Sequence, residues 1–144
     1  MLIGEYRHTL DNKKRVALPA RFRKALGKRV VVTRGFDKCL FIYSEGAWKK
    51  LSEKFTTLPM GPSDTRDLNR FMFAGAVLSD VDSLGRILIP DFLKEFAGLK
   101  TKVVVIGVHE RLELWDEKTW EGYKGRIEAQ ADTIAEKLGD LGAF

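Results

Sequence analysis

The chain has 144 residues, 44% of them hydrophobic, which fits one globular domain or two very small ones packed together. No apolar run approaches the roughly 20 residues of a membrane-spanning helix, and the charged residues near the N-terminus leave no signal-peptide core. The single cysteine, Cys39, excludes an internal disulfide. We therefore expect a cytoplasmic protein without a membrane partner.

Charge is distributed unevenly along the chain. The net charge is +5, but residues 1–55 hold 14 Lys or Arg against 5 Asp or Glu, whereas the remaining residues hold 11 against 15. A basic first half predicts a surface for a polyanion such as nucleic acid, and a different role for the second half. The simpler alternative is a basic face that only keeps the protein in solution.

The first half predicts two strands around a turn, a short helix, two more strands and a second helix. The segment "LDNKKRVALP" at 10–19 supplies the basic turn and an aliphatic strand, and Pro19 and Gly27 should bound the short helix. "RVVVT" at 29–33 and "CLFIY" at 39–43 are typical of paired buried strands. Ser44 is the expected N-cap of the second helix.

Residues 56–67, "TTLPMGPSDTRD", are rich in Pro, Gly, Ser and Thr and predict a linker between a first module at 1–55 and a second at 68–144. The second module begins with a short helix, "LNRFMFAGA". The chain ends in an amphipathic helix, which we expect to dock on its own domain or on a neighbouring subunit. Its apolar positions recur every seven residues, at Trp120, Ile127, Ile134 and Leu141.

The two modules are copies of one another. "VDSLGRILIP" at 81–90 repeats the pattern of 10–19, so that Asp11 and Arg15 correspond to Asp82 and Arg86. Further on, "GFDKCLFIYSEGAW" at 35–48 aligns with "GVHERLELWDEKTW" at 107–120, and Asp116 takes the N-cap position of Ser44. About fifty residues match in order and spacing, which predicts two pseudo-repeated β-rich modules that pair with each other and protect their sheet edges.

Two Asp-x-x-x-Arg turns about seventy residues apart, each followed by an aliphatic-Pro segment, resemble the MraZ family of bacterial regulators of the division and cell-wall gene cluster. The opening "GEYRHTLD" and the later "ERLELWD" strengthen the resemblance, which covers nearly the whole chain. It implies an α+β fold of two AbrB/SpoVT-like swapped-hairpin β-barrel modules. It also implies a homo-oligomeric ring of eight or more subunits that binds short direct repeats in the promoter of its own operon. One departure is Lys14, which stands where the second copy has Gly85.

The first turn holds the strongest DNA-binding candidates. Lys13, Lys14 and Arg15 should lie at its tip, where lysines give phosphate affinity and an arginine can also bind a guanine bidentately. Arg7 and His8 precede the turn on the same strand. We expect Asp11 to accept hydrogen bonds from turn amides or from the Arg15 guanidinium, and so to aim that side chain.

The second turn differs from the first in its surroundings. Its tip is Ser83-Leu84-Gly85, and four acidic residues are close to Arg86 in sequence, namely Asp80, Asp82, Asp91 and Glu95. Arg86 is therefore a weaker DNA-binding candidate, and a structural or intersubunit role is favoured for it.

Other classes of function find little support. The chain has no Walker loop, dinucleotide-binding glycine set, Gly-x-Ser-x-Gly or His-Glu-x-x-His motif, so we expect no enzyme, no cofactor and no small-molecule substrate. His8, His109 and Cys39 lack the spacing of zinc ligands. The sequence thus predicts a sequence-specific regulator that binds double-stranded promoter DNA in the nucleoid. An RNA-binding or nucleoid-associated protein and an AbrB-type structural or antitoxin module remain as alternatives.

Overall fold

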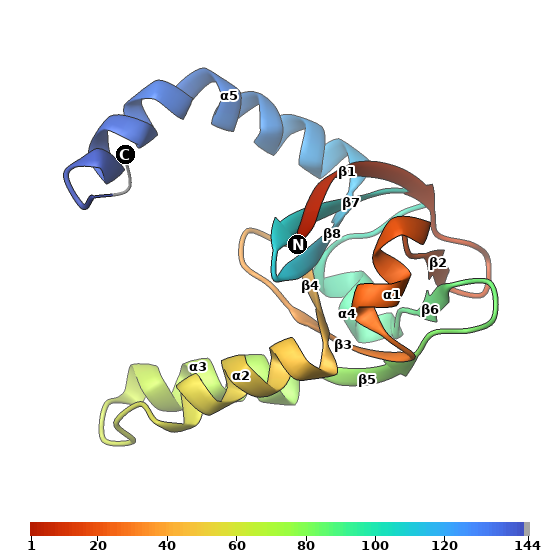
Figure 1. The fold of residues 1–144 in the computed structure, drawn as a ribbon, viewed down its shortest axis with the longest axis horizontal. Helices are drawn as coiled ribbons and strands as arrows, with labels where there is room; N and C mark the ends of the chain where they lie inside the picture. The colour runs from red at the N-terminus through yellow and green to blue at the C-terminus, as the bar shows by residue number, and fades with distance from the viewer. Residues whose placement is uncertain (143–144) are drawn as a thin grey trace.

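Strands from both halves of the chain form two antiparallel sheets in the computed structural model, which describes residues 1–142 (Figure 1). The larger sheet contains β1 (Leu2–Thr9), β7 (Lys102–His109), β8 (Arg111–Asp116), β4 (Leu40–Ser44), β3 (Arg29–Arg34) and β5 (Val77–Asp80), in that order. The smaller sheet pairs β2 (Arg15–Ala17) with β6 (Arg86–Leu88). The predicted order of strands and helices in each repeat is present.

Pairing crosses from one repeat to the other. Among the strands of residues 1–142, β1 pairs with β7, β2 with β6, β3 with β5, and β4 with β8, whereas only β3–β4 and β7–β8 pair within a repeat. The expected first hairpin is therefore a loop whose two strands, β1 and β2, each find a partner in the second repeat. The α+β class with two swapped, pseudo-repeated units is confirmed. The division into 1–55, 56–67 and 68–144 stays a prediction. Four strand pairs join residues of the first segment to residues of the third.

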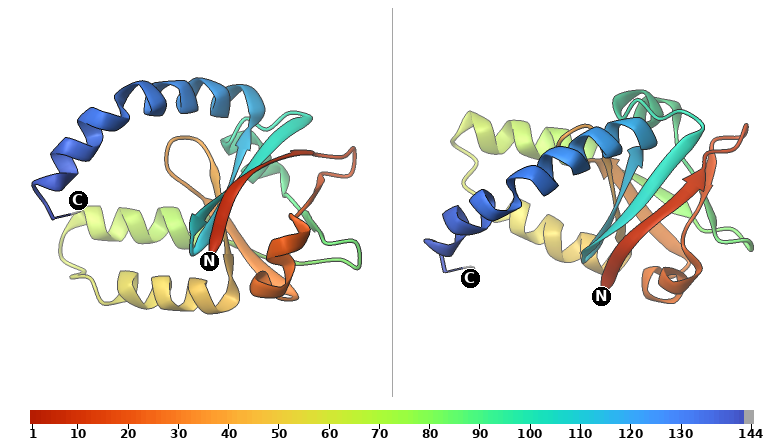
Figure 2. Two further views of the ribbon diagram at one scale, coloured as in Figure 1. Left: turned by 45° about the horizontal axis from the view of Figure 1, so that its top comes forward. Right: turned by 90° about the horizontal axis from the view of Figure 1, so that it is seen from above.

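We call the two sheets together the barrel, and helices lie at its ends and on one side of it (Figures 1 and 2). The short helices start after the prolines, as predicted, with η1 (Ala20–Phe22) and α1 (Arg23–Leu26) after Pro19 and α4 (Asp91–Phe96) after Pro90. α2 (Glu45–Thr56) and α3 (Ser63–Ala74) form a helical hairpin, so part of the predicted linker is helical. α5 (Glu117–Gly139) ends the described chain.

The two predicted N-caps behave differently. The Ser44 hydroxyl accepts a hydrogen bond from the Ala47 amide at 3.1 Å, as expected for a cap. Asp116 occupies the cap position of α5, but its carboxylate makes no cap hydrogen bond. It accepts instead from the Lys100 amide at 3.1 Å, because the segment before β7 passes beside it.

Two hydrophobic clusters stabilise the fold. The larger one fills the barrel with aliphatic residues of both repeats, among them Leu18, Ile42, Ile89 and Leu114, all fully buried. The second lies on the other face of the large sheet, beneath α2, the last turns of α3 and the first turns of α5, and contains the following residues: Cys39, Phe41, Tyr43, Met72, Val104, Ile106, Trp115 and Trp120. Burying a large apolar side chain contributes about 1.5–3 kcal/mol, so these shared clusters join the two repeats firmly.

α5 docks only through its first turns. Trp120 is buried and Tyr123 is half-buried, both packed around Trp115. The later half of α5 stands clear of the barrel (Figures 1 and 2). Ile127, Ile134 and Leu138 are 39–43% exposed there. Docking along the whole helix within the chain is therefore not observed. No helix of residues 1–142 is long and apolar enough to cross a membrane.

Candidate nucleic-acid interface

The two Asp-x-x-x-Arg loops project side by side from one end of the barrel (Figures 1 and 2). We call residues 10–14 the first loop and residues 81–85 the second loop. Each loop holds the end of the other repeat's short strand, since the Leu18 amide after β2 donates to the Gly85 carbonyl and the Ile89 amide after β6 donates to the Lys14 carbonyl, both at 2.8 Å. The β2–β6 ladder continues this pairing. Two motifs that are 71 residues apart in sequence thus form one surface.

Asp11 holds the first loop and its arginine. One carboxylate oxygen accepts from the Lys13 and Arg15 amides, each at 2.9 Å, and the other accepts from Arg15 Nε at 2.9 Å. The backbone hydrogen bond from Arg15 is the main cause that keeps the pKa of Asp11 below its ordinary value. The expected role of Asp11 in aiming Arg15 agrees with this geometry. The remaining N–H groups of the guanidinium are not held by Asp11.

The second loop repeats this arrangement. Asp82 accepts from the Leu84 and Arg86 amides at 2.9 and 2.8 Å and from Arg86 Nε at 2.8 Å. Its pKa is lowered too, first by the Arg86 amide. One of the acids expected around Arg86 has another partner, because Asp91 forms an ion pair with Lys14 of the first loop.

Lys14 and Gly85 occupy equivalent left-handed positions, with φ of 61° and 78°. A lysine in this conformation is strained, because its Cβ approaches the neighbouring carbonyl oxygen. The departure noted in the sequence therefore has a structural cost in the first loop.

Arg7 and His8 lie apart from the loop tips. The Arg7 guanidinium contacts three carboxylates of β1 and α5, those of Glu5, Glu117 and Glu121. Burial, followed by the charge of Arg23, lowers the pKa of His8, which favours a neutral imidazole. The structure brings Asp11, Lys13, Lys14, Arg15 and Arg86 together and leaves these two outside that group.

Two lysines of the second repeat also lie beside the first loop. Lys94 and Lys100 line a groove of about 530 Å³ together with residues 9–12, Lys14, Leu99 and Thr101. Neither lysine belongs to a motif, and both come from the acidic half of the chain. The sequence alone does not indicate these two lysines, because their place depends on the packing of the first loop against the second repeat.

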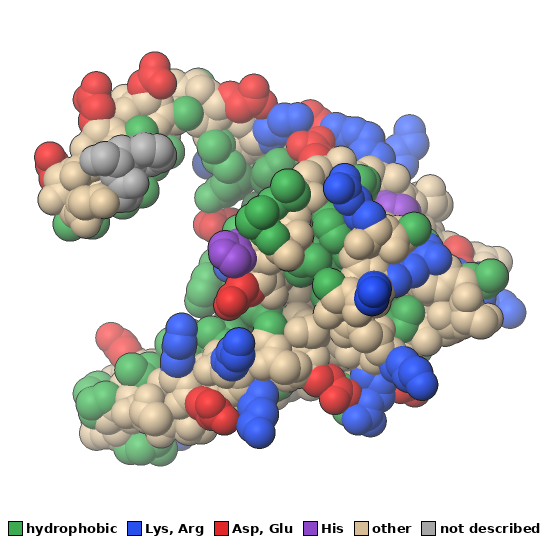
Figure 3. Space-filling model, viewed as in Figure 1, with side chains coloured by type: hydrophobic (Ala, Val, Ile, Leu, Met, Phe, Trp, Pro, Cys, Tyr) green, Lys and Arg blue, Asp and Glu red, His purple; other side chains and the backbone are tan. Residues whose placement is uncertain are grey.

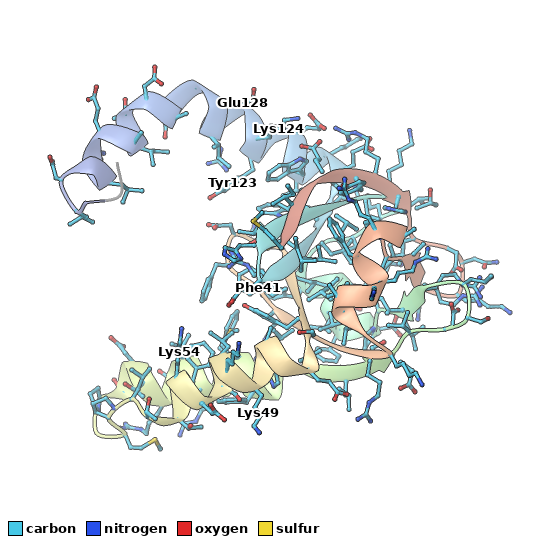
Figure 4. All side chains as sticks on the ribbon, in the orientation of Figure 1. Phe41, Lys49, Lys54, Tyr123, Lys124 and Glu128 are labelled. Carbon is cyan, nitrogen blue, oxygen red and sulfur yellow. The ribbon has the colours of Figure 1, made fainter. Side chains whose placement is uncertain are left out.

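A second exposed region lies between α5 and the α2–α3 hairpin. Tyr123 of α5 and Lys54 of α2 face the space between these elements, with Phe41 on the barrel beside it (Figure 4). Hydrophobic side chains gather on the inner side of α5, whereas acidic side chains stand on its outer side (Figure 3). A pocket of about 540 Å³ lies between α2 and the β7–β8 turn, with Tyr43, Leu51, Lys54 and Arg111 in its walls.

The residues considered for other chemistry do not form a site. Cys39 is buried, and burial raises the pKa of its thiol, so the reactive thiolate is suppressed. Within residues 1–142 no three His, Cys, Asp or Glu side chains are grouped so that they could hold a metal ion.

A fold of two interwoven repeats that presents paired Asp–Arg loops defines a duplicated swapped-hairpin protein. The family model described as "MraZ protein, putative antitoxin-like" matches the chain twice, over residues 1–71 and 72–141. The chain therefore belongs to the MraZ family.

Curated relatives match along almost their full length. Proteins named "Transcriptional regulator MraZ" from Acetivibrio thermocellus and Caldanaerobacter subterraneus are each 47% identical and cover 99% and 98% of this chain and 99% of their own length. The same-named protein of Roseiflexus castenholzii is 44% identical over 98% of this chain and 99% of its own. These relatives identify the chain as a transcriptional regulator and not an enzyme.

One solved structure shows a distant likeness. The solution structure of PHS018 from Pyrococcus horikoshii is 14% identical, with a TM-score of 0.32 over 79% of this chain and 88% of that one. A likeness at this level says nothing about the function of either protein.

Proposed function

We propose that the protein binds double-stranded promoter DNA in a sequence-specific manner through the two adjacent loops. The observation that carries this proposal is the pair of arginines, each oriented by an aspartate, at one end of the barrel. The β2–β6 ribbon supports both loops, and a two-stranded ribbon with its loops is narrow enough for the major groove. A guanidinium held in a fixed position is suited to bidentate contact with guanine.

The residues of the two loops have different roles in this proposal. Arg15 contacts a base edge, Lys13 and Lys14 contact phosphates, and Asp11 orients Arg15. Lys14 keeps its ion pair with Asp91 and contacts a phosphate through its other N–H groups. Arg86 makes a second, weaker contact, since its loop tip carries no lysine. Arg7 and His8 lie at the periphery of the bound DNA.

Assembly into a homo-oligomeric ring of eight or more subunits forms the second part of the proposal. The exposed apolar face of α5 and the pocket beside α2 support a subunit interface, because a helix face of this kind gains stability when a neighbour covers it. A ring presents one pair of loops per subunit at regular intervals, which suits short direct repeats. We place these repeats in the promoter of the protein's own division and cell-wall operon, and the protein in the cytoplasm at the nucleoid.

A gel shift tests the DNA-binding part. The protein should retard a duplex of its own promoter at concentrations that leave a scrambled duplex and a matched RNA unbound. Since each neutralised phosphate contributes about −0.9 to the slope of log K against log salt, binding should weaken steeply with salt. Equal retardation of the promoter and the scrambled duplex would remove the claim of sequence specificity.

An antitoxin-like assembly module is the second candidate, because the matching family model is described as "putative antitoxin-like". Such a protein would hold a partner protein as its main task. The same gel shift separates the two candidates, since the second requires no preference for the promoter. RNA binding is less favoured, because the tip of the first loop has no aromatic side chain on which bases could stack.

A further inference from the structure

The groove beside the first loop is built jointly by the two repeats. The Leu10 amide donates to the Thr101 carbonyl at 2.8 Å, which ties the base of the first loop to the segment before β7. The Lys100 amide in turn donates to the Asp116 carboxylate at 3.1 Å. The backbone of Lys100 is thus fixed at a constant distance from the loop. Lys94 extends from α4 into the same groove.

At the equivalent place beside the second loop, Arg23 lies against the backbone of the loop. The Arg23 guanidinium packs on Gly85, and its Nε donates to the Leu18 carbonyl at 3.1 Å. A Cβ added at Gly85 would clash with the Arg23 guanidinium. In the first loop, Lys14 carries that Cβ. Lys94, which corresponds to Arg23 in the repeat, therefore cannot pack in the same way.

The groove is positively charged. Of the neighbouring carboxylates, Asp11 is bound to Arg15 and Asp91 to Lys14. The hydrogen bond from Lys14 is the first cause of the low pKa of Asp91, and the charge of Lys94 contributes to it. Across residues 1–142, neither Lys94 nor Lys100 forms an ion pair. Two ammonium groups therefore remain available beside the DNA-binding tip.

We propose that this groove receives the DNA backbone and that Lys94 and Lys100 each contact a phosphate. The inference rests on the proposed DNA binding and extends it, because it assigns a phosphate-binding surface to the second repeat. Phosphate contacts fix the register of a protein on the duplex, whereas base contacts select the sequence. The two lysines position the first loop so that Arg15 meets the same base in every bound subunit.

The test is the salt dependence of DNA binding by the assembled protein carrying both Lys94→Gln and Lys100→Gln. Each lost phosphate contact should make the slope of log K against log salt shallower by about 0.9 for every engaged subunit. Affinity for promoter and scrambled duplex should fall by similar factors, so that their ratio stays within about threefold of the wild-type value.

A matched variant controls for the loss of charge. Lys49→Gln with Lys137→Gln removes two charges from α2 and α5, far from the loops, and should leave the slope unchanged; Figure 4 shows Lys49 on α2. Sedimentation of each variant verifies that assembly is intact. If the wild-type protein binds its promoter with a steep slope and the Lys94/Lys100 variant has the same slope, the phosphate role is refuted while the proposed function stands. A wild-type protein without promoter preference would overturn the proposed function itself.

Discussion

Asp11–Arg15 and Asp82–Arg86 are held by the same three hydrogen bonds, yet the residues between them differ. The first loop carries Asn12-Lys13-Lys14, whereas the second carries Ser83-Leu84-Gly85 with Leu84 61% exposed. Both copies of the motif have the hydrogen bonds that aim the arginine. The positive charge of Lys13 and Lys14 at the tip has no counterpart in the second copy. The comparison indicates that orientation of the arginine is the shared requirement, and that phosphate affinity is concentrated in the first loop.

Replacing the two arginines separately tests this comparison most strongly. Arg15→Ala should weaken promoter binding more than a hundredfold, because a base contact is worth about 1–3 kcal/mol and several subunits lose it together. Arg86→Ala should weaken binding less, by about tenfold. Both are measured by gel shift, with sedimentation to show that assembly survives. Equal losses would mean that the two loops contact DNA in the same way.

Disrupting assembly should sharpen the comparison, because DNA binding by the loops of a single subunit can then be measured. Ile134→Asp with Leu138→Asp places charges on the exposed apolar face of α5. If this face joins subunits, the variant should sediment as a smaller species. Its affinity for a promoter with several repeats should then fall about a hundredfold, since linked sites no longer act together. Unchanged sedimentation would show that α5 is not part of the interface. Lys137→Gln on the same helix is the mild control.

Much of the fold could be predicted from local pattern. Pro19 and Pro90 begin short helices and β-branched runs form strands, because these preferences depend on near neighbours. The exchange of strands between repeats could not be predicted in this way. A strand such as β1 carries the same hydrophobic pattern whichever partner it takes, and pairing with the next strand along the chain is the usual expectation.

The candidate site was predictable to a similar extent. The bonds from Asp11 to Arg15 follow from four-residue spacing at a turn. The contacts of Arg7 with α5, the ion pair of Lys14 with Asp91 and the position of Lys100 all join residues from different repeats. They depend on the tertiary fold, so a charge count by halves of the chain does not show that Lys94 and Lys100 lie beside the first loop.

The aspartates offer a smaller test of the same comparison. Asp11→Asn should weaken promoter binding roughly tenfold at pH 7, because an amide replaces the ionised acceptor of a charge-assisted bond. Asp82→Asn should have a lesser effect.

The folded-state pKa of Asp11 lies below its unfolded value, so its contribution to stability is present above the ordinary range near pH 4 and is lost as the pH falls through the lowered value. Between pH 7 and 5 this carboxylate should thus leave binding unchanged, which a titration by fluorescence anisotropy can measure.

The smallest effects concern the left-handed position of each loop, which is Lys14 in the first and Gly85 in the second. Gly85→Ala should destabilise the protein by about 1–2 kcal/mol, because alanine is disfavoured at positive φ and its Cβ would displace Arg23. Lys14→Gly relieves strain in the folded state but frees the unfolded chain, so its effect on the free energy of unfolding should stay within about 1 kcal/mol. Thermal unfolding measures both. Lys14→Gly should still weaken DNA binding, since one phosphate contact per subunit is lost. A Lys14→Gly variant that binds DNA as tightly as the wild type would show that Lys14 makes no phosphate contact.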